Sequence, residues 1–297
     1  MIKGHILFFM VIHFFVFSQN VITEYDSNLA ADRLEKLNKK TPLNLSYNIE
    51  VENYIKDYLY RNREKLSQML ALSDYYFPIF EASLDKYNLP LEIKYLPIIE
   101  SELNPVAKSP MGATGMWQIM FNTAKEYGLI VSSYVDERMD VEKSTEMACQ
   151  YFKKSYNRFN DWESAIASYN VGQYGVVKAI KRSGGKPGYW QYRAFLPTET
   201  QQYVPKFIAA VYVMNYAELY GVYPTDTMIS PNEIDTLKIN RRLNLEILAN
   251  IINIDENILY KLNPEYKLKI IPEVEHRDYY LRLPKTYIND YLENRDS

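Results

Sequence analysis

Apolar side chains recur at helical spacing between residues 51 and 220, and this periodicity limits the possible fold more than any other feature of the chain. Val51, Tyr54, Ile55, Tyr58 and Leu59 follow the i, i+3, i+4, i+7, i+8 pattern of a helix with one buried face. The same reasoning predicts further helices over residues 73–87, 90–101, 121–127, 141–159, 160–172, 173–182 and 198–220. Because none of these segments needs a strand, the sequence predicts a mainly α domain.

Polar residues at the helix starts support these boundaries. Asp140 can cap the helix that follows it. Asn160 with Glu163, and Thr198 with Gln201, have the spacing of a capping box, in which two side chains satisfy free backbone amides at a helix start.

Residues 96–120 place one carboxylic acid, Glu100, between an apolar helix and a loop of turn-forming residues. Pro90 suits the first position of this helix and Pro97 is expected to kink it. Glu100 then lies near the helix end, at the margin of the buried face. Partial burial raises the pKa of a glutamate and keeps a proton available near neutral pH. A glutamate in such a place is more often exposed, so spacing alone does not decide its role.

Four motifs follow one another in the order and spacing of a known enzyme family. They are ESELNP, SPMGATGMWQIM, SYNVG at 168–172 and PTETQQYV at 197–204. Together they resemble the signatures of lytic transglycosylases with the goose-type lysozyme (SLT) fold, and residues 75–97 resemble the membrane-bound murein transglycosylase D branch. The resemblance implies a lysozyme-like catalytic domain over residues 47–225.

The same resemblance implies which residues act on a glycan. Glu100 is the catalytic acid, Ser101 orients it or caps the helix, and Tyr169 contacts the carboxyl or the sugar beside it. Trp117 supplies an aromatic plate. The remaining residues implied in substrate binding are Ser109, Gln118, Met120, Asn170, Glu199 and Tyr203. Without the motifs each has an ordinary alternative, such as a solvated hydroxyl, a turn residue or a core tyrosine.

The implied reaction cleaves the β-1,4 bond between N-acetylmuramic acid (MurNAc) and N-acetylglucosamine (GlcNAc) of peptidoglycan and leaves 1,6-anhydro-MurNAc ends. Glycosidases usually need a second carboxylate, and only Glu100 stands in a matching motif. A hydrolytic muramidase on the same fold and a non-catalytic cell-wall binding protein are the alternatives.

The first 18 residues read as a secretory signal peptide, with Lys3 ahead of an apolar run from Ile6 to Phe17. This run is shorter than the ~20 residues that span a bilayer. No cysteine follows it to carry a lipid, so we expect a periplasmic protein without a stable membrane span. Residues 19–46 are expected to form a mobile lead-in. The single cysteine, Cys149, is expected in the core.

After Pro224 the pattern changes to strand, helix, helix, strand over residues 232–290. TLKIN and YYLRLP alternate like strands, whereas LNLEILANIIN and DENILYKLN read as short helices. This small α+β C-terminal unit resembles a lysin-motif (LysM) sugar-binding module in divergent form. A structural cap on the catalytic domain is the alternative.

Composition excludes several other classes of function. The formal net charge of -3 offers no basic surface for nucleic acid. The three histidines do not form a metal-ligand pattern with cysteine, and no phosphate-binding glycine loop is present. We therefore expect a monomer that binds peptidoglycan glycan strands without a metal or cofactor.

Overall fold

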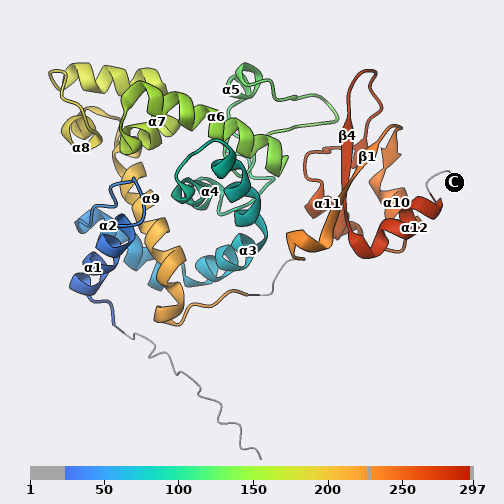
Figure 1. Cartoon of the computed structure of the whole chain (residues 1–297), viewed down its shortest axis with the longest axis horizontal. Helices are drawn as coiled ribbons and strands as arrows, with labels where there is room; N and C mark the ends of the chain where they lie inside the picture. The colour runs from blue at the N-terminus through green and yellow to red at the C-terminus, as the bar shows by residue number, and fades with distance from the viewer. Residues whose placement is uncertain (1–23, 226–228, 295–297) are drawn as a thin grey trace, which may run out of the picture.

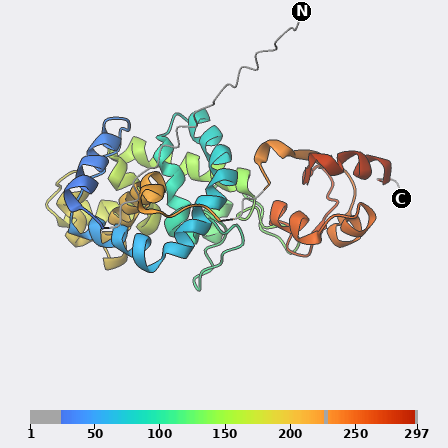
Figure 2. The same ribbon diagram turned by 90° about the horizontal axis from the view of Figure 1, so that it is seen from below.

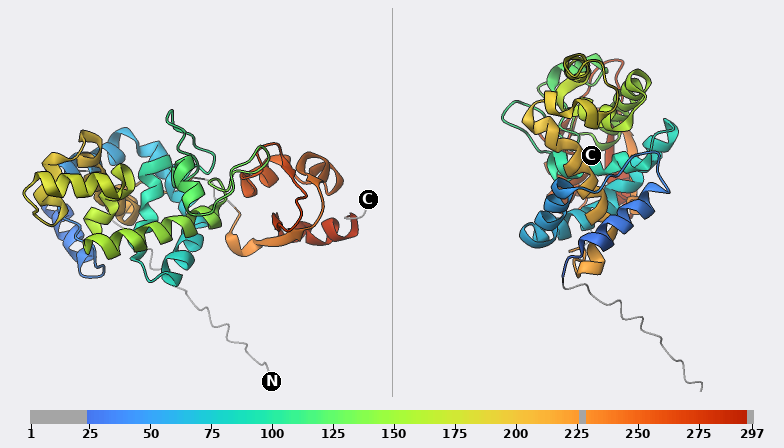
Figure 3. Two further views of the ribbon diagram at one scale, coloured as in Figure 1. Left: turned by 90° about the horizontal axis from the view of Figure 1, so that it is seen from above. Right: turned by 90° about the vertical axis from the view of Figure 1, so that its left-hand side faces the viewer.

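The computed structural model describes residues 24–225 and 229–294, which form a larger helical unit and a smaller unit that contains the strands (Figure 1). Figure 2 and Figure 3 show the two units side by side from other directions. The helices of the larger unit are α1 (Ser27–Asn38), α2 (Ile49–Lys56), α3 (Arg63–Lys86), α4 (Leu96–Ser101), α5 (Phe121–Glu126), α6 (Val141–Phe159), α7 (Trp162–Arg182), α8 (Tyr189–Tyr192) and α9 (Thr198–Tyr216). The mainly α fold predicted from the sequence is confirmed.

Helix α9 is the centre of the larger unit. It contacts α2, α4 and α7, and from Tyr203 to Val213 nearly every side chain is buried. A helix that is apolar on all sides must be surrounded by other elements. This central position lets α9 carry side chains to the end of α4, where Glu100 lies. Its first residue follows Pro197, and no side chain caps it, so the expected capping role of Thr198 is wrong.

Residues 27–38 form a docked helix and not the mobile lead-in expected for this segment. Asp26 caps α1 by accepting hydrogen bonds from the amides of Asn28 (2.8 Å) and Leu29 (3.1 Å). Ala30 and Leu34 are buried in the main core. Arg33 donates to the hydroxyls of Tyr212 (3.1 Å) and Tyr220 (3.0 Å). The expectation failed because charged residues between these few apolar positions obscure the helical spacing.

The segment that leads to Glu100 is divided into two short helices. Leu91–Tyr95 forms a 3₁₀ helix, and α4 begins at Leu96 with Pro97 in its first turn. Proline has no amide proton to donate and is favoured in the first turn of a helix, where Pro97 lies, so Pro97 begins α4 and does not kink a longer helix. The helix ends at Ser101, because Glu102 takes a left-handed conformation with φ 55°.

Helix α7 also consists of two parts. Gly172 has φ 76° and ψ 152°, which interrupts the helix at the SYNVG motif, as the sequence predicted. Asp161, and not Asn160, caps the start of α7 by accepting from the Ser164 amide (2.9 Å). Asn160 instead ends α6 in a left-handed conformation. Asp140 caps α6 as expected, and Cys149 on that helix is fully buried.

The smaller unit has the predicted strand, helix, helix, strand order. Strand β1 (Ile234–Ile239) pairs antiparallel with β4 (Tyr279–Pro284), and Leu237 lies opposite Leu281. Helices α10 (Leu245–Ile251) and α11 (Glu256–Leu262) pack beside this pair around a separate hydrophobic core. A second small pair, β2 (Leu243–Asn244) with β3 (Ile270–Ile271), and the final helix α12 (Ile288–Asn294) complete the unit.

Backbone contacts join the two units. Val135 and Tyr266 form an antiparallel bridge, the Asp136 amide donates to the Glu265 carbonyl (2.9 Å), and the Lys267 amide donates to the Tyr134 carbonyl (2.9 Å). The loop before α6 thus adds a short strand-like edge to the C-terminal unit.

A buried ionic cluster lies at the same junction. Arg282 on β4 donates to Glu265 Oε1 (2.9 Å) and to Asp140 Oδ2 (3.1 Å), and all three side chains are buried. Burial raises the pKa of Glu265, and the Arg282 guanidinium opposes that rise. Because Asp140 also caps α6, one arginine of the C-terminal unit holds the start of a main helix of the larger unit.

None of the helices in the described residues is both long enough and apolar enough to cross a membrane.

Candidate active site

Glu100 occupies the last turn of α4, at the edge of the main core. Leu96 and Ile98 on the same helix are fully buried, whereas Glu100 itself is only partly exposed. The pKa of Glu100 is raised to about 7, mainly by burial; a hydrogen bond from Tyr203 opposes the rise, and the nearby Glu199 charge adds to it. A carboxyl group with this pKa is protonated in a large fraction of molecules at neutral pH, as a general acid must be.

Tyr203 on α9 is the tyrosine that contacts Glu100. Its hydroxyl donates a hydrogen bond to Glu100 Oε1, and its ring is buried. Burial, the Glu100 charge and this hydrogen bond raise the pKa of Tyr203 well above its usual range, so Tyr203 stays a donor. The sequence placed Tyr203 only at the border of the groove and gave Tyr169 a contact with the carboxyl or with the sugar beside it.

Tyr169 supports the loop after Glu100 and does not donate to the carboxyl. Its hydroxyl donates to the Trp117 carbonyl (2.7 Å), and its ring stacks on Phe152 with centroids 5.0 Å apart. The Glu100 charge still contributes, after burial, to raising the pKa of Tyr169, which shows that both groups share one region. Tyr169 therefore fixes the backbone that faces Glu100.

Trp117 is a core residue, and the expected aromatic plate is wrong. Its side chain is fully buried against Phe80, and its indole nitrogen donates to Thr145 Oγ1 (2.9 Å). The backbone carbonyl of Trp117, and not its ring, belongs to the site.

The loop between α4 and α5 is held by its own backbone and by Gln118. Gly115 has φ 85°, and a Cβ there would lie 1.9 Å from the Arg138 carbonyl oxygen, so only glycine fits. Gln118 has φ 46°, and its side-chain amide donates to the carbonyls of Gly115 (2.9 Å) and Ala107 (3.3 Å). The Gln118 side chain thus closes the loop, and its oxygen makes no hydrogen bond within the described residues.

The two serines of the motifs are engaged with the same loop. The Ser101 hydroxyl donates to the carbonyls of Met116 (2.9 Å) and Pro97 (3.2 Å), which ties the end of α4 to the loop. The Ser109 hydroxyl accepts from the Ala113 amide (3.0 Å) and closes the turn around Met111. Neither hydroxyl contacts the Glu100 carboxyl. Met120 at the end of the loop is 44% exposed, so its thioether is available to a ligand.

Asn170 and Glu199 form a polar pair beside Glu100. Asn170 Nδ2 donates to Glu199 Oε1 (3.2 Å), and Asn170 Oδ1 accepts from Thr200 Oγ1 (2.7 Å). These bonds join the kink of α7 to the first turn of α9. They also hold a second carboxylate close enough to Glu100 to affect its pKa.

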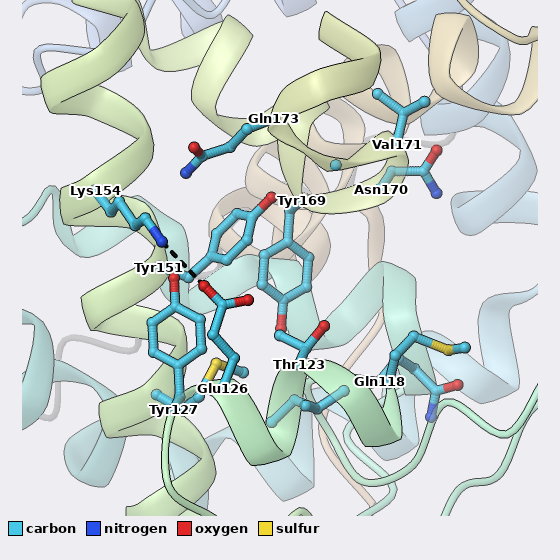
Figure 4. Close-up of a pocket in the computed structure, with 14 residues that line it drawn as sticks. Gln118, Thr123, Glu126, Tyr127, Tyr151, Lys154, Tyr169, Asn170, Val171 and Gln173 are labelled. Atoms are coloured by element: carbon cyan, nitrogen blue, oxygen red, sulfur yellow. Dashed lines mark hydrogen bonds and ion pairs between the residues drawn. The ribbon is translucent and has the colours of Figure 1, made fainter.

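A polar pocket of about 470 Å³ opens beside these residues, between α5, α6 and α7. Figure 4 shows Gln118, Tyr169 and Asn170 on its wall, together with Tyr127, Tyr151 and an ion pair between Lys154 Nζ and Glu126 Oε1 (3.0 Å). Sequence reasoning missed Glu126, Tyr127, Tyr151, Lys154 and Gln173, because they lie on helices outside the four motifs. The structure brings together Glu100, Tyr203, Tyr169, Asn170 and Glu199, whereas Ser109 lies in the outer turn of the loop.

Two family models match this chain. Residues 77–191 match the model described as Transglycosylase SLT domain, and residues 233–297 match the model described as Lytic transglycosylase MltD, LysM-like domain. The first match contains Glu100, the glycine-rich loop and the SYNVG motif. The second covers the strand, helix, helix, strand unit.

Individual relatives match parts of the chain. Membrane-bound lytic murein transglycosylase D of Escherichia coli (strain K12) is 36% identical over 166 residues, which are 54% of this chain and 36% of that protein. Membrane-bound lytic murein transglycosylase F of Vibrio campbellii is 33% identical over 123 residues, 38% of this chain and 22% of that protein. The crystal structure of the 70 kDa soluble lytic transglycosylase of Escherichia coli aligns with a TM-score of 0.41 and 26% identity, over 48% of this chain and 24% of that one. The chain thus spans little more than a third of the first curated relative.

The order of the two matched regions agrees with the resemblance found in the motifs, and the divergent LysM pattern has its own family model. Residues 77–191 are therefore similar to the transglycosylase SLT domain, and residues 233–297 are similar to the LysM-like domain of lytic transglycosylase MltD.

Proposed function

We propose that this protein is a peptidoglycan lytic transglycosylase that cleaves the β-1,4 bond between MurNAc and GlcNAc and leaves 1,6-anhydro-MurNAc ends. The observation that carries the proposal is Glu100, a partly buried carboxyl at a helix end whose pKa is raised to about 7. The names of the matched relatives, which describe lytic murein transglycosylases, agree with this substrate class.

In the first step Glu100 acts as general acid. Its proton passes to the oxygen between MurNAc and GlcNAc, the bond from that oxygen to the MurNAc anomeric carbon breaks, and GlcNAc leaves with a new hydroxyl. The acetamido group of the same MurNAc stabilises the developing positive charge. The Tyr203 hydroxyl, which donates to Glu100 Oε1, stabilises the carboxylate that forms.

In the second step ionised Glu100 acts as general base. It removes the proton of the MurNAc C6 hydroxyl, whose oxygen bonds to the anomeric carbon and closes the 1,6-anhydro ring. Glu100 regains its proton, so the cycle needs no water. Proximity favours this route, because the attacking hydroxyl belongs to the same sugar as the cation.

The other motif residues bind the glycan or shape its groove in this proposal. The free Gln118 oxygen, the Met120 thioether and Asn170 offer contacts along the wall that also holds Tyr169, and Glu199 accepts a hydrogen bond from Asn170 beside it. Ser101, Ser109 and Tyr169 act through the loop backbone that they hold. We assign the catalytic domain to residues 47–225.

A muramidase is the second candidate, and Glu199 is the observation that favours it. Its charge acts on Glu100, so a second carboxylate is present that could activate water. Against this, Glu199 Oε1 accepts a hydrogen bond from Asn170, which competes with a bond to water.

We further propose that the protein is exported to the periplasm and acts there as a monomer. The signal-like pattern of residues 1–18, which lie outside the described residues, supports export. Residues 232–290 form the small C-terminal domain in this proposal, and binding of glycan strands is the role that its LysM-like match favours.

Mass spectrometry of a peptidoglycan digest tests the reaction. Anhydro ends are lighter than reducing ends by one water, so the wild-type digest should contain mainly the lighter species, while Glu100→Gln should release almost nothing. A digest dominated by reducing ends before any chemical reduction would identify a hydrolase. Undiminished release by Glu100→Gln would move the acid to another residue, with Glu199→Gln as the next variant.

A further inference from the structure

A groove of about 760 Å³ lies between the catalytic and C-terminal units, and its lining includes Ser101 and Glu102, which directly follow Glu100. One wall comes from α3 and from the loop after α4, where the apolar side chains of Leu72, Pro105 and Val106 are accessible. The other wall comes from α11 and the loop that follows it, with Tyr260, Lys261 and Lys269. Its volume falls in the range of known ligand sites, about 300–1,000 Å³.

The two walls are fixed relative to each other. The bridge between Val135 and Tyr266 and the buried cluster around Arg282 join the units at the same junction. Lys267, two residues before Lys269, donates from Nζ to the Ser132 carbonyl (2.7 Å). The groove is therefore already formed before a ligand binds, so binding costs the protein little conformational entropy.

The groove carries positive charge that the described residues do not neutralise. Lys65 pairs with Glu102 (2.6 Å), but neither Lys261 nor Lys269 forms an ion pair within residues 24–225 and 229–294. Burial lowers the pKa of Lys269, and the Glu256 charge opposes this effect only in part. Glu256 is itself engaged, because its Oε2 accepts from the Tyr260 hydroxyl (3.0 Å).

The arrangement around Tyr260 disfavours a sugar as the ligand. Lys269 Nζ lies 3.9 Å from the centre of the Tyr260 ring, so that face of the ring is covered by an ammonium group and not free to stack on a pyranose. A neutral glycan also has no group that pairs with two cations. The combination of apolar wall and unpaired lysines instead fits a chain in which small apolar groups alternate with carboxylates.

We propose that this groove binds the carboxylate-bearing peptide stem of peptidoglycan, with Lys261 and Lys269 pairing with its carboxylates and the α3 wall contacting its methyl groups. The amide side chains of Gln68 and Asn257, which also line the groove, can bond the peptide backbone. This inference rests on the proposed function, because that function brings the protein to peptidoglycan. It adds a peptide site that adjoins the catalytic acid at Ser101 and differs from the pocket lined by Tyr169.

Titration calorimetry with the Glu100→Gln protein tests the proposal without cleavage of the probe. The probes are a free tetrapeptide stem, the same peptide with its carboxylates amidated, and the peptide-free GlcNAc–MurNAc disaccharide. We expect the stem to bind, amidation to weaken binding at least tenfold, and Lys261→Gln and Lys269→Gln each to weaken it about tenfold, because a charge-assisted bond is lost. Lys285→Gln, which removes an exposed lysine outside the groove, should bind as the parent does.

Several outcomes would overturn the proposal. Unchanged stem affinity in both lysine variants would place the peptide elsewhere. Equal binding of an all-L acidic peptide of the same charge would assign the groove to an acidic protein segment. Cleavage of glycan by the protein with intact Glu100 is measured separately. Stem binding without cleavage would refute the proposed function and support the peptide site. Cleavage without stem binding would support the proposed function and refute the peptide site.

Discussion

Replacing Glu100 by glutamine should stabilise the folded protein at alkaline pH while it removes the catalytic proton. Burial raises the pKa of Glu100 from 4.5 to about 7. The folded protein therefore keeps a proton that the unfolded chain has already lost between these two values, so the free energy of unfolding falls as the pH rises through this window. One pKa unit corresponds to about 1.4 kcal/mol, so ionised Glu100 costs the folded state about 3 kcal/mol at alkaline pH.

Glutamine has the shape of glutamate without the charge, and its oxygen still accepts from Tyr203. The stability of Glu100→Gln relative to wild type should therefore be about 2 to 3 kcal/mol greater at about pH 8.5 than at about pH 5. Urea denaturation followed by tryptophan fluorescence measures this difference. Trp117, Trp162 and Trp190 all lie in the larger unit, and they are the only tryptophans of the chain, so the signal reports the unit that contains Glu100.

Glu102→Gln is the matched control. Glu102 lies two residues on and its side chain is 52% exposed in an ion pair with Lys65, so its loss should cost at most ~1 kcal/mol with little dependence on pH. If Glu100→Gln and Glu102→Gln shift stability equally at both pH values, the burial argument for Glu100 is refuted.

Three further predictions concern the contacts around the site and the junction. Tyr203→Phe removes a hydrogen bond that favours ionised Glu100, so the pKa should rise and the alkaline limb of the kcat/KM profile should move to higher pH, with kcat reduced about tenfold. Glu199→Gln removes a like charge, so the same limb should move to lower pH; equal shifts in both variants would contradict these assignments. Arg282→Met leaves Asp140 and Glu265 without their cation and should lower the free energy of unfolding by about 3–5 kcal/mol in urea denaturation, whereas Arg242→Met on the exposed surface should change it by less than ~0.5 kcal/mol.

Local patterns in the sequence predicted the parts of the fold that depend on interactions between residues close together in the chain. Asp140 as a helix cap, the break at Gly172 and the strand pattern of residues 279–284 all follow from spacing over a few residues, and the structure confirms them. Two neighbouring residues could cap α7, and the prediction chose the wrong one, because Asp161 and not Asn160 is the N-cap. The start of α3 at Arg63 was also missed, because scattered polar residues weaken the helical pattern before Ser73.

Contacts between distant segments could not be predicted in this way. The hydrogen bond between Tyr203 and Glu100 joins residues 103 positions apart, and only the packing of α9 against α4 brings them together. Burial of Trp117 depends on Phe80 and Thr145, which come from α3 and α6. Both tyrosines lie in the motifs, but only the three-dimensional arrangement shows that Tyr203, and not Tyr169, donates to the Glu100 carboxyl.

In the proposed function, the bridge between Val135 and Tyr266 determines how the C-terminal unit assists cleavage. A binding module on a flexible linker raises the effective concentration of substrate over a wide volume, whereas a module fixed in place does so only for substrates of matching span. A peptide stem bound in the groove between the units would therefore hold its glycan at one set distance from Glu100. Long strands that reach both the groove and Glu100 would gain avidity from this arrangement, and short fragments would gain none. The junction would therefore set the shortest substrate that benefits from the C-terminal unit.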